Sequence, residues 1–122
     1  MKEWDVQLTN QAESDLRNIY EYIALTLFEP NIARNLIRRF ETKISKLCVM
    51  PLSYAVYPKE PWKSRGLRRV NEGNYGIFFV PQEKRHNVIV VRIMYGGRDI
   101  ERILDDMLSD CTTESIKTDA GE

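Results

Sequence analysis

Cationic side chains concentrate in one short stretch of the sequence. Lys59–Arg69 contains five of them against a single acid, Glu60; the five are Lys59, Lys63, Arg65, Arg68 and Arg69. A further arginine, Arg98, follows two glycines and precedes Asp99. Guanidinium and ammonium groups bind carboxylates and phosphates, so these positions predict a surface for an acidic partner or a nucleic acid. The alternative is a solvated edge strand, with Asp99 capping a helix.

Metal ligands are scarce in this chain. It has one histidine, His86, and two cysteines, Cys48 and Cys111. These are too few for a four-ligand zinc site or a disulfide framework. We therefore expect no metal and no other cofactor, and reduced thiols in a cytoplasmic protein.

The formal net charge of zero hides an asymmetry. Residues 1–104 carry 17 Lys and Arg against 12 Asp and Glu, a net charge of +5. Residues 105–122 carry Lys117 against six acids, a net charge of −5. Proteins that hold nucleic acid through phosphate contacts are usually more basic than this. The balance is compatible with an acidic partner and does not require a nucleic acid.

Length and composition restrict the architecture. The 122 residues suffice for one domain, and 43% hydrophobic with 30% charged residues is typical of a globular chain. No apolar run approaches the roughly 20 residues of a membrane-spanning helix, and the first residues lack the order of a secretory signal. We expect a single domain over residues 1–108. Residues 109–122, rich in Ser, Thr, Asp and Glu, are expected to form an acidic, disordered tail.

Two helices are predicted in the first half of the chain. Residues 4–8 alternate apolar and polar side chains, which indicates a strand. Apolar residues then recur every three or four positions over 12–27 and again over 33–47, which predicts helices with one apolar stripe each. Asp15 falls on the polar side of the first. Only a few residues separate the two helices, so we expect an antiparallel hairpin that packs on a sheet.

The second half is predicted to be rich in β-structure. A loop over 51–66 precedes three strands, at 67–70, 75–80 and 88–95. Pro81 is expected to end the second strand, and the continuous apolar run of the third predicts a central position in the sheet. A last helix is expected from Asp99 to Leu108. The order β-α-α-β-β-β-α indicates an α+β domain with an αα-hairpin on a mainly antiparallel sheet.

A series of short motifs over residues 4–104 is similar to one known family. They are Leu8-Thr9-Asn10-Gln11-Ala12-Glu13-Ser14-Asp15-Leu16, Tyr22-Ile23, Pro30 with Ala33, Leu47 with Pro51, Gly66-Leu67-Arg68, Asn74-Tyr75 with Ile77-Phe78-Phe79-Val80, and Val91-Arg92-Ile93 with Gly96-Gly97-Arg98-Asp99-Ile100. Their order and separations resemble the RelE/ParE toxins of bacterial type II toxin–antitoxin (plasmid stabilisation) systems. The resemblance implies the small RelE-like fold and growth arrest as the activity.

The same resemblance implies partners and two alternative targets. A cognate antitoxin is expected to wrap and neutralise the toxin in a hetero-oligomer. RelE-type members cut messenger RNA on the ribosome, whereas ParE-type members lack that catalytic set and inhibit DNA gyrase. Since both types share one fold, the residues of the site must discriminate between them.

The positions that resemble the nuclease site depart from its pattern. RNA cleavage by the 2′-hydroxyl needs a proton acceptor, a proton donor and cations around the phosphate. RelE-type toxins supply lysines, arginines and a C-terminal tyrosine; of these Arg98 is kept, and Arg69 falls near a basic position. Gly76 stands where an arginine is expected, and Leu104 where the tyrosine is expected. We therefore expect a ParE-like toxin that inhibits gyrase by binding, with messenger RNA cleavage as the alternative.

The candidate site residues follow from these matches. The catalytic candidates, should the chain be a nuclease, are Arg98, Arg69 and Tyr75, with Tyr95 as a substitute for Tyr75. The target-binding candidates are Lys63, Arg68, Arg69 and Arg98. The alternative, purely structural interpretation of Tyr75 is a core residue whose hydroxyl has a hydrogen-bond partner.

Apolar residues crowd the turn between the two predicted helices, and they are Leu25, Leu27, Phe28 and Ile32. An exposed groove there would suit an apolar face of an antitoxin helix. The other interpretation, which we favour from the sequence, is a wide stripe buried within the domain.

Overall fold

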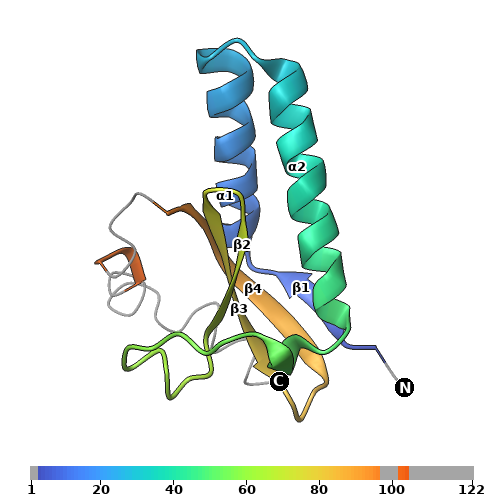
Figure 1. Cartoon of the computed structure of the whole chain (residues 1–122), viewed down its shortest axis with the longest axis vertical. Coiled ribbons are helices and arrows are strands. Elements are labelled where there is room, and N and C mark those ends of the chain that lie inside the picture. Colours follow the sequence, from blue (N-terminus) through green and yellow to red (C-terminus); the bar gives the residue numbers. More distant parts are fainter. Residues whose placement is uncertain (1–2, 97–101, 105–122) are drawn as a thin grey trace.

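The computed structural model describes residues 3–96 and 102–104. Its main elements are β1 (Asp5–Leu8), α1 (Asn10–Glu21), α2 (Pro30–Ser45), β2 (Arg68–Glu72), β3 (Tyr75–Gln82) and β4 (Asn87–Tyr95), as Figure 1 shows. Two short 3₁₀ turns, Lys46–Cys48 and Pro51–Ser53, follow α2. This order confirms the predicted α+β fold. Within the described ranges, no helix has the length and hydropathy needed to cross a membrane.

The four strands form one mixed sheet in the order β1-β4-β3-β2. β1 runs parallel to β4, and the other two pairs are antiparallel. The apolar strand β4 therefore lies in the interior of the sheet, as its sequence predicts. Opposite β3 its register shifts, because Phe78 pairs with Arg92 while Phe79 pairs with Val90. Val91 is left over as a β-bulge, which twists β4 at this point.

The start of α1 is fixed to this bulge. The Thr9 hydroxyl oxygen accepts a hydrogen bond from the Ala12 amide (3.0 Å), which caps the helix. The same hydroxyl donates to the Val91 carbonyl (3.1 Å), 82 residues away in the sequence. One side chain thus satisfies a free helix amide and joins the helix to the central strand.

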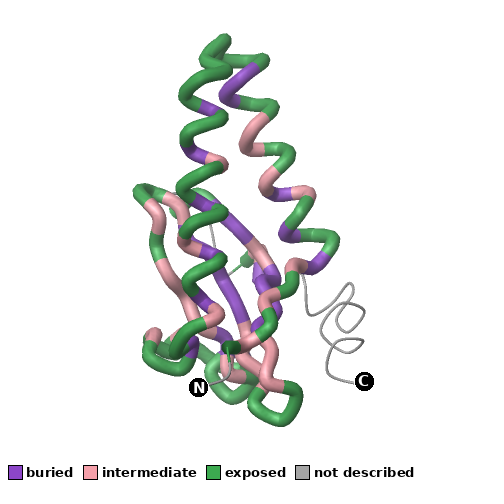
Figure 2. Tube along the Cα trace, turned by 90° about the vertical axis from the view of Figure 1, so that its right-hand side faces the viewer, coloured by how far each residue is buried: buried purple, intermediate pink, exposed green. Residues whose placement is uncertain are grey.

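The two faces of the sheet carry separate apolar cores. The helix face, covered by α1 and α2, buries Ala12, Ala33, Phe40, Ile77 and Phe79 among other residues. The opposite face, here called the loop face, buries Trp62, Leu67, Phe78, Val91 and Leu104 among other residues. Figure 2 shows the buried positions on the sheet and on the inner sides of the helices. Trp62 is 2% exposed, so it is a packing residue of the loop-face core.

The helical hairpin extends beyond the sheet, as Figures 1 and 2 show. The sequence predicts one helix as far as Leu27, but α1 ends at Glu21 and continues as a π-helical turn over Tyr22–Thr26. The apolar residues of the tip are exposed: Leu25 by 66%, Leu27 by 48%, Phe28 by 81% and Ile32 by 54%. The interpretation that they are buried within the domain is wrong, because none of the described strands extends far enough to cover them (Figure 1).

Two strand boundaries also differ from the predictions. β2 continues to Glu72, which leaves a two-residue turn of Gly73 and Asn74 in which Gly73 has φ +61°. β3 passes through Pro81 to Gln82. β2 pairs with β3 only as far as Phe79, so one side of β3 has no neighbour at the proline, where the missing N–H is tolerated.

The chain after β4 is described only in part. Residues 102–104 are helical, and Leu104 is fully buried on the loop face. Residues 97–101, with Arg98 and the predicted cap Asp99, lie outside the described residues. So do residues 105–122, with the predicted tail over 109–122.

We expect Phe28→Gly to stabilise the isolated chain. Phe28 has φ +57° and is exposed by 81%, so it is strained and makes little contact in return. The left-handed conformation costs a side-chain-bearing residue about 1–2 kcal/mol, which glycine avoids. Glycine is also more flexible in the unfolded chain, and this offsets about 0.5–1 kcal/mol of the gain. Urea denaturation should therefore show a gain of up to about 1 kcal/mol.

Phe28→Ala is the matched control, because it removes the ring and keeps the Cβ that causes the strain. Its free energy of unfolding should stay within about 0.5 kcal/mol of the parent. A loss of stability in both variants would show that the ring packs on the hairpin and would contradict this interpretation.

Candidate functional site

The predicted site residues divide between the two faces of the sheet. Arg69 lies on the loop face with its cross-strand neighbour Phe78, whereas Arg68 and Tyr75 pack toward the helix face. Lys63 is exposed in the loop before β2. Arg98 lies outside the described residues. A cluster that is continuous in the sequence therefore forms two surfaces in the fold, because successive strand residues point to opposite faces.

The Arg69 guanidinium lies across β3 at Gly76. Its Nε donates to Asn71 Oδ1 (2.9 Å), and its Cζ lies 5.2 Å from the centre of the Phe78 ring. A Cβ placed on Gly76 would be only 2.8 Å from Arg69 Nε. The absence of a side chain at position 76 thus makes room for the Arg69 guanidinium. The nuclease pattern expects an arginine at position 76, and in this chain the guanidinium of Arg69, from the neighbouring strand β2, occupies that space.

The end of β4 also approaches this guanidinium. A Cβ on Gly96 would lie 3.6 Å from an Arg69 terminal nitrogen and 3.0 Å from the Asn74 carbonyl oxygen. The Gly96 amide donates to that carbonyl (2.7 Å). A bulky residue at position 96 would separate these segments, so the two glycines, Gly76 and Gly96, together determine how closely Arg69 packs.

Arg68 is engaged on the other side of β2. Its guanidinium donates to the Tyr54 carbonyl (2.5 Å) and more weakly to the Leu52 carbonyl (3.4 Å). Its Nε is buried and has no hydrogen-bond partner in the described part of the chain. These contacts hold the segment after α2 against the sheet, which is a structural role.

Tyr75 lines a cleft of about 780 Å³ between α1 and the ends of β3 and β4. The cleft is lined by Gln11, Asp15, Asn18, Ile19, Tyr22, Tyr75, Arg92, Ile93, Met94 and Tyr95. The Tyr75 ring contacts Phe40 (centroids 5.3 Å apart) and Tyr95 (5.4 Å). Burial raises the pKa of Tyr75, and the neighbouring Tyr95 and Tyr22 raise it further. Its hydroxyl therefore stays neutral at physiological pH and is no base.

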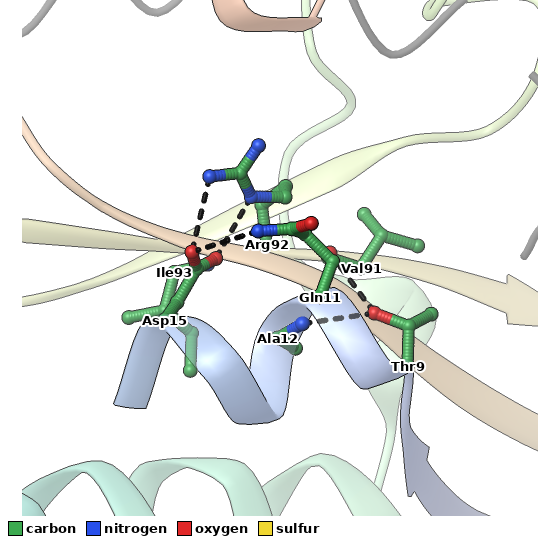
Figure 3. Close-up of polar contacts among 7 residues, drawn as sticks. All are labelled: Thr9, Gln11, Ala12, Asp15, Val91, Arg92 and Ile93. Carbon is green, nitrogen blue, oxygen red and sulfur yellow. Dashed lines mark hydrogen bonds and ion pairs between the residues drawn. The ribbon is translucent and has the colours of Figure 1, made fainter. Parts of the chain in front are cut away.

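A buried ion pair lies beside this cleft, and Figure 3 shows its contacts. Arg92 donates to both oxygens of Asp15, from Nε at 2.8 Å and from a terminal nitrogen at 3.0 Å. The Ile93 amide donates to the same carboxylate (2.9 Å). Asp15 is only 7% exposed, so its predicted place on the polar side of the helix is wrong. The signal in the sequence was Arg92, a charge within the apolar run of the central strand, which needs a partner.

The loop face holds one phenol that sequence reasoning missed. Tyr57 packs against the core of this face, and its ring centroid lies 6.2 Å from that of Phe78. Arg69 contacts the same Phe78 ring, so a hydroxyl and a guanidinium share one neighbour. Leu104, at the position expected for a tyrosine, is buried and apolar. Tyr57 sits in the Pro-rich loop, where no periodic pattern indicated it.

Comparison of the sequence with known protein families identifies the family of this chain. Residues 6–100 match the family described as the ParE toxin of the type II toxin–antitoxin system parDE. The match covers well over half of the chain, and the chain belongs to this family. It is thus the toxin of a type II toxin–antitoxin system of the ParE/RelE group.

Solved structures show the same fold. A chain of the chromosomal ParDE system from P. aeruginosa superposes with a TM-score of 0.63 at 20% identity, covering 76% of this chain and 96% of that one. The RelBE2 toxin–antitoxin complex from Mycobacterium tuberculosis gives 0.55 at 18% identity, with 78% and 93% covered. The isolated E. coli RelE toxin gives 0.52 at 8% identity, with 86% and 98% covered. No curated protein sequence matches the chain significantly.

We expect Asp15→Ala to destabilise the fold strongly. The change leaves the Arg92 guanidinium and the Ile93 amide buried without their acceptor, and the loss of one partner of a buried pair costs about 3–5 kcal/mol. Urea denaturation measures it. Glu13→Ala, on the exposed side of the same helix, should stay within about 0.5 kcal/mol of the parent.

The double variant Asp15→Ala/Arg92→Ala completes the cycle. It should cost clearly less than the two single changes added together, since each single change leaves the other charge unpaired. Additive costs would contradict the coupling that the geometry implies.

Tyr75 should titrate above the ordinary tyrosine value in the folded chain. Tyr95→Phe should lower the pKa of Tyr75 toward that value, because the change removes one of the neighbours that raise it. NMR of ¹³Cζ-labelled tyrosine follows the ionisation directly. Since the folded pKa exceeds the unfolded one, this group's stabilisation is complete below about pH 10 and is lost as the pH rises further.

Tyr20→Phe is the control, because Tyr20 is not among the groups that raise the Tyr75 pKa. An unchanged Tyr75 pKa in Tyr95→Phe, or an equal change in Tyr20→Phe, would contradict the stated cause.

Proposed function

We propose that this toxin arrests growth by binding and inhibiting DNA gyrase in the cytoplasm, and that it does not cut messenger RNA. The observation that carries the proposal is the separation of Arg69 from the expected proton carriers. Arg69 lies on the loop face, whereas Tyr75 and Tyr95 lie together at the cleft beside α1. Among the described residues, Arg69 and these two phenols therefore do not converge on one phosphate, which cleavage by them would require.

The chemistry of the loop face supports binding over catalysis. A guanidinium stabilises negative charge, but its pKa is too high for proton transfer at neutral pH. Leu104 has no proton to exchange, and Gly76 has no side chain. Arg98 follows Gly96 by two residues in the sequence, and Gly96 lies beside Arg69. Arg69 and Arg98 together would therefore offer paired cations for an acidic surface of the target.

Tyr57 supports messenger RNA cleavage as a second candidate function. It is the phenol that contacts Phe78 on the loop face, within the residues that the structure describes. A RelE-type reaction in this chain would use Tyr57 as its proton carrier beside Arg69. Messenger RNA cleavage would therefore require the Tyr57 hydroxyl, whereas gyrase inhibition by binding would not.

The exposed hairpin tip supports binding of the cognate antitoxin. Tyr22, Leu25 and Phe28 are exposed by 56%, 66% and 81% on the protruding end of the molecule. Such a patch is typical of a surface covered by a partner, and the apolar face of an amphipathic helix could cover it. The solved relatives include ParDE and RelBE toxin–antitoxin systems.

Pulse-labelling after brief induction without the antitoxin tests the target. Incorporation of labelled thymidine and methionine is followed in the same bacterial culture. We expect thymidine incorporation to fall first, because gyrase inhibition blocks DNA synthesis directly. An earlier fall of methionine incorporation would contradict the proposal and favour the ribosome as the target.

Purified protein then tests the residues. Arg98→Ala and Arg69→Gln should keep the fold and weaken inhibition of gyrase supercoiling about ten- to a hundredfold, the worth of one charged hydrogen bond. Arg17→Gln, an exposed arginine on α1, is the charge-matched control and should inhibit normally.

Tyr57→Phe separates the two candidate functions. A toxin that acts by binding should keep its toxicity in this variant. Loss of toxicity together with loss of messenger RNA cleavage on ribosomes would overturn the gyrase proposal and identify the nuclease.

A further inference from the structure

The second half of α2 and the first residue after it carry a cationic stripe that the proposed function does not use. The α2 stripe consists of Arg38, Arg39, Lys43 and Lys46, which with Thr42 and Glu72 line a shallow hollow of about 310 Å³. Residues three and four positions apart lie on one side of a helix, so these side chains are neighbours. Arg38, Arg39 and Lys46 are exposed.

The described part of the chain neutralises only one of these charges. Arg39 donates to Glu72 at 3.0 Å. Within residues 3–96 and 102–104, no carboxylate pairs with Arg38, Lys43 or Lys46. The helix macrodipole favours cations in the last turn alone. Lys43 fits that explanation, but Arg38 and Arg39 lie about two turns before the end of α2 at Ser45.

A ligand of complementary charge is present in the same chain. Residues 105–122 carry six acids against Lys117, a net charge of −5. They begin directly after Leu104, which is buried on the loop face. Eighteen residues span up to about 60 Å when extended, whereas a domain of this size has a radius of gyration of about 13 Å. The segment is therefore long enough to reach the far side of the molecule.

The occupancy of such a stripe depends on whether its ligand is tethered to the same chain. Exposed ion pairs are individually weak, and a few phosphate contacts give little affinity for a separate nucleic acid at physiological salt. A tethered segment instead acts at an effective concentration in the millimolar range. The hollow is also small, which suits single carboxylates better than a duplex.

We propose that the α2 stripe is a binding surface for an acidic peptide, and that its resident ligand is the segment 105–122 of the same chain. The proposal is independent of the toxin's target. Its consequence is that a polyanionic partner reaches α2 only after it displaces this segment.

A spin label on Cys111, near the middle of the segment, tests the contact in the full-length chain. Cys48→Ser leaves Cys111 as the single cysteine for a nitroxide. We expect paramagnetic broadening of amide signals over residues 38–46. An increase of salt from about 0.1 M to 1 M shortens the Debye length from about 10 Å to 3 Å and should abolish it.

Charge variants provide the matched comparison. Arg38→Gln/Lys43→Gln/Lys46→Gln should reduce the broadening over 38–46 at least about twofold, because the stripe loses its unpaired cations. Arg17→Gln/Lys84→Gln removes exposed cations elsewhere and should leave the broadening unchanged.

Three results would overturn the proposal. One is no broadening over 38–46, and another is broadening that persists in the stripe variant or at about 1 M salt. The third is a chain that binds a short DNA duplex through Arg38 and Lys43 equally well with and without the acids of 105–122 changed to amides. That result would make the stripe a nucleic-acid surface.

Discussion

Asp15 accepts hydrogen bonds from both the side chain of Arg92 and the backbone of Ile93, and this contact fixes α1 on the central strand. It lies next to the bulge at Val91, where the register between β3 and β4 shifts. Thr9 reaches the same bulge from the start of α1. Two polar contacts thus set the register of the helix on the sheet. The hairpin, the cleft and the α2 stripe all take their positions from that register.

The alternation of strand side chains determines what the molecule can do. Arg68 and Arg69 are adjacent in the sequence, yet one holds a backbone segment and the other lies over Phe78 on the opposite face. Tyr75, next to Gly76 in β3, likewise packs on the helix face and not on the loop face. Arg69 and Tyr75 thus lie on opposite faces of the sheet, because successive strand residues point to opposite faces. On the loop face, this arrangement leaves a guanidinium over an aromatic ring.

Most of the fold could be predicted from the sequence, and the finer site could not. Periodicity was enough for the order of the described helices and strands and for the central place of β4, because each depends on local pattern, whereas the ends of α1, β2 and β3 differ from the predictions. The burial of Asp15 depends on Arg92, a residue 77 positions away, and no local pattern carries it. The exposed tip was considered but not favoured, because periodicity reports which residues are apolar and not whether anything covers them. Likewise, the place of Arg69 depends on Gly76 in β3 and on Gly96 just after β4.

The parallel pairing of β1 with β4 has a consequence for synthesis on the ribosome. β1 emerges first, but its partner residues begin at Asn87, so the sheet cannot close until nearly the whole domain has been translated. Contacts of such long sequence separation form slowly and leave apolar segments uncovered in the meantime. During that interval the nascent chain lacks both the loop face and the cleft in their final form. A toxin built in this way has its working surface assembled last, which gives an antitoxin already present in the cell time to meet the chain before that surface exists.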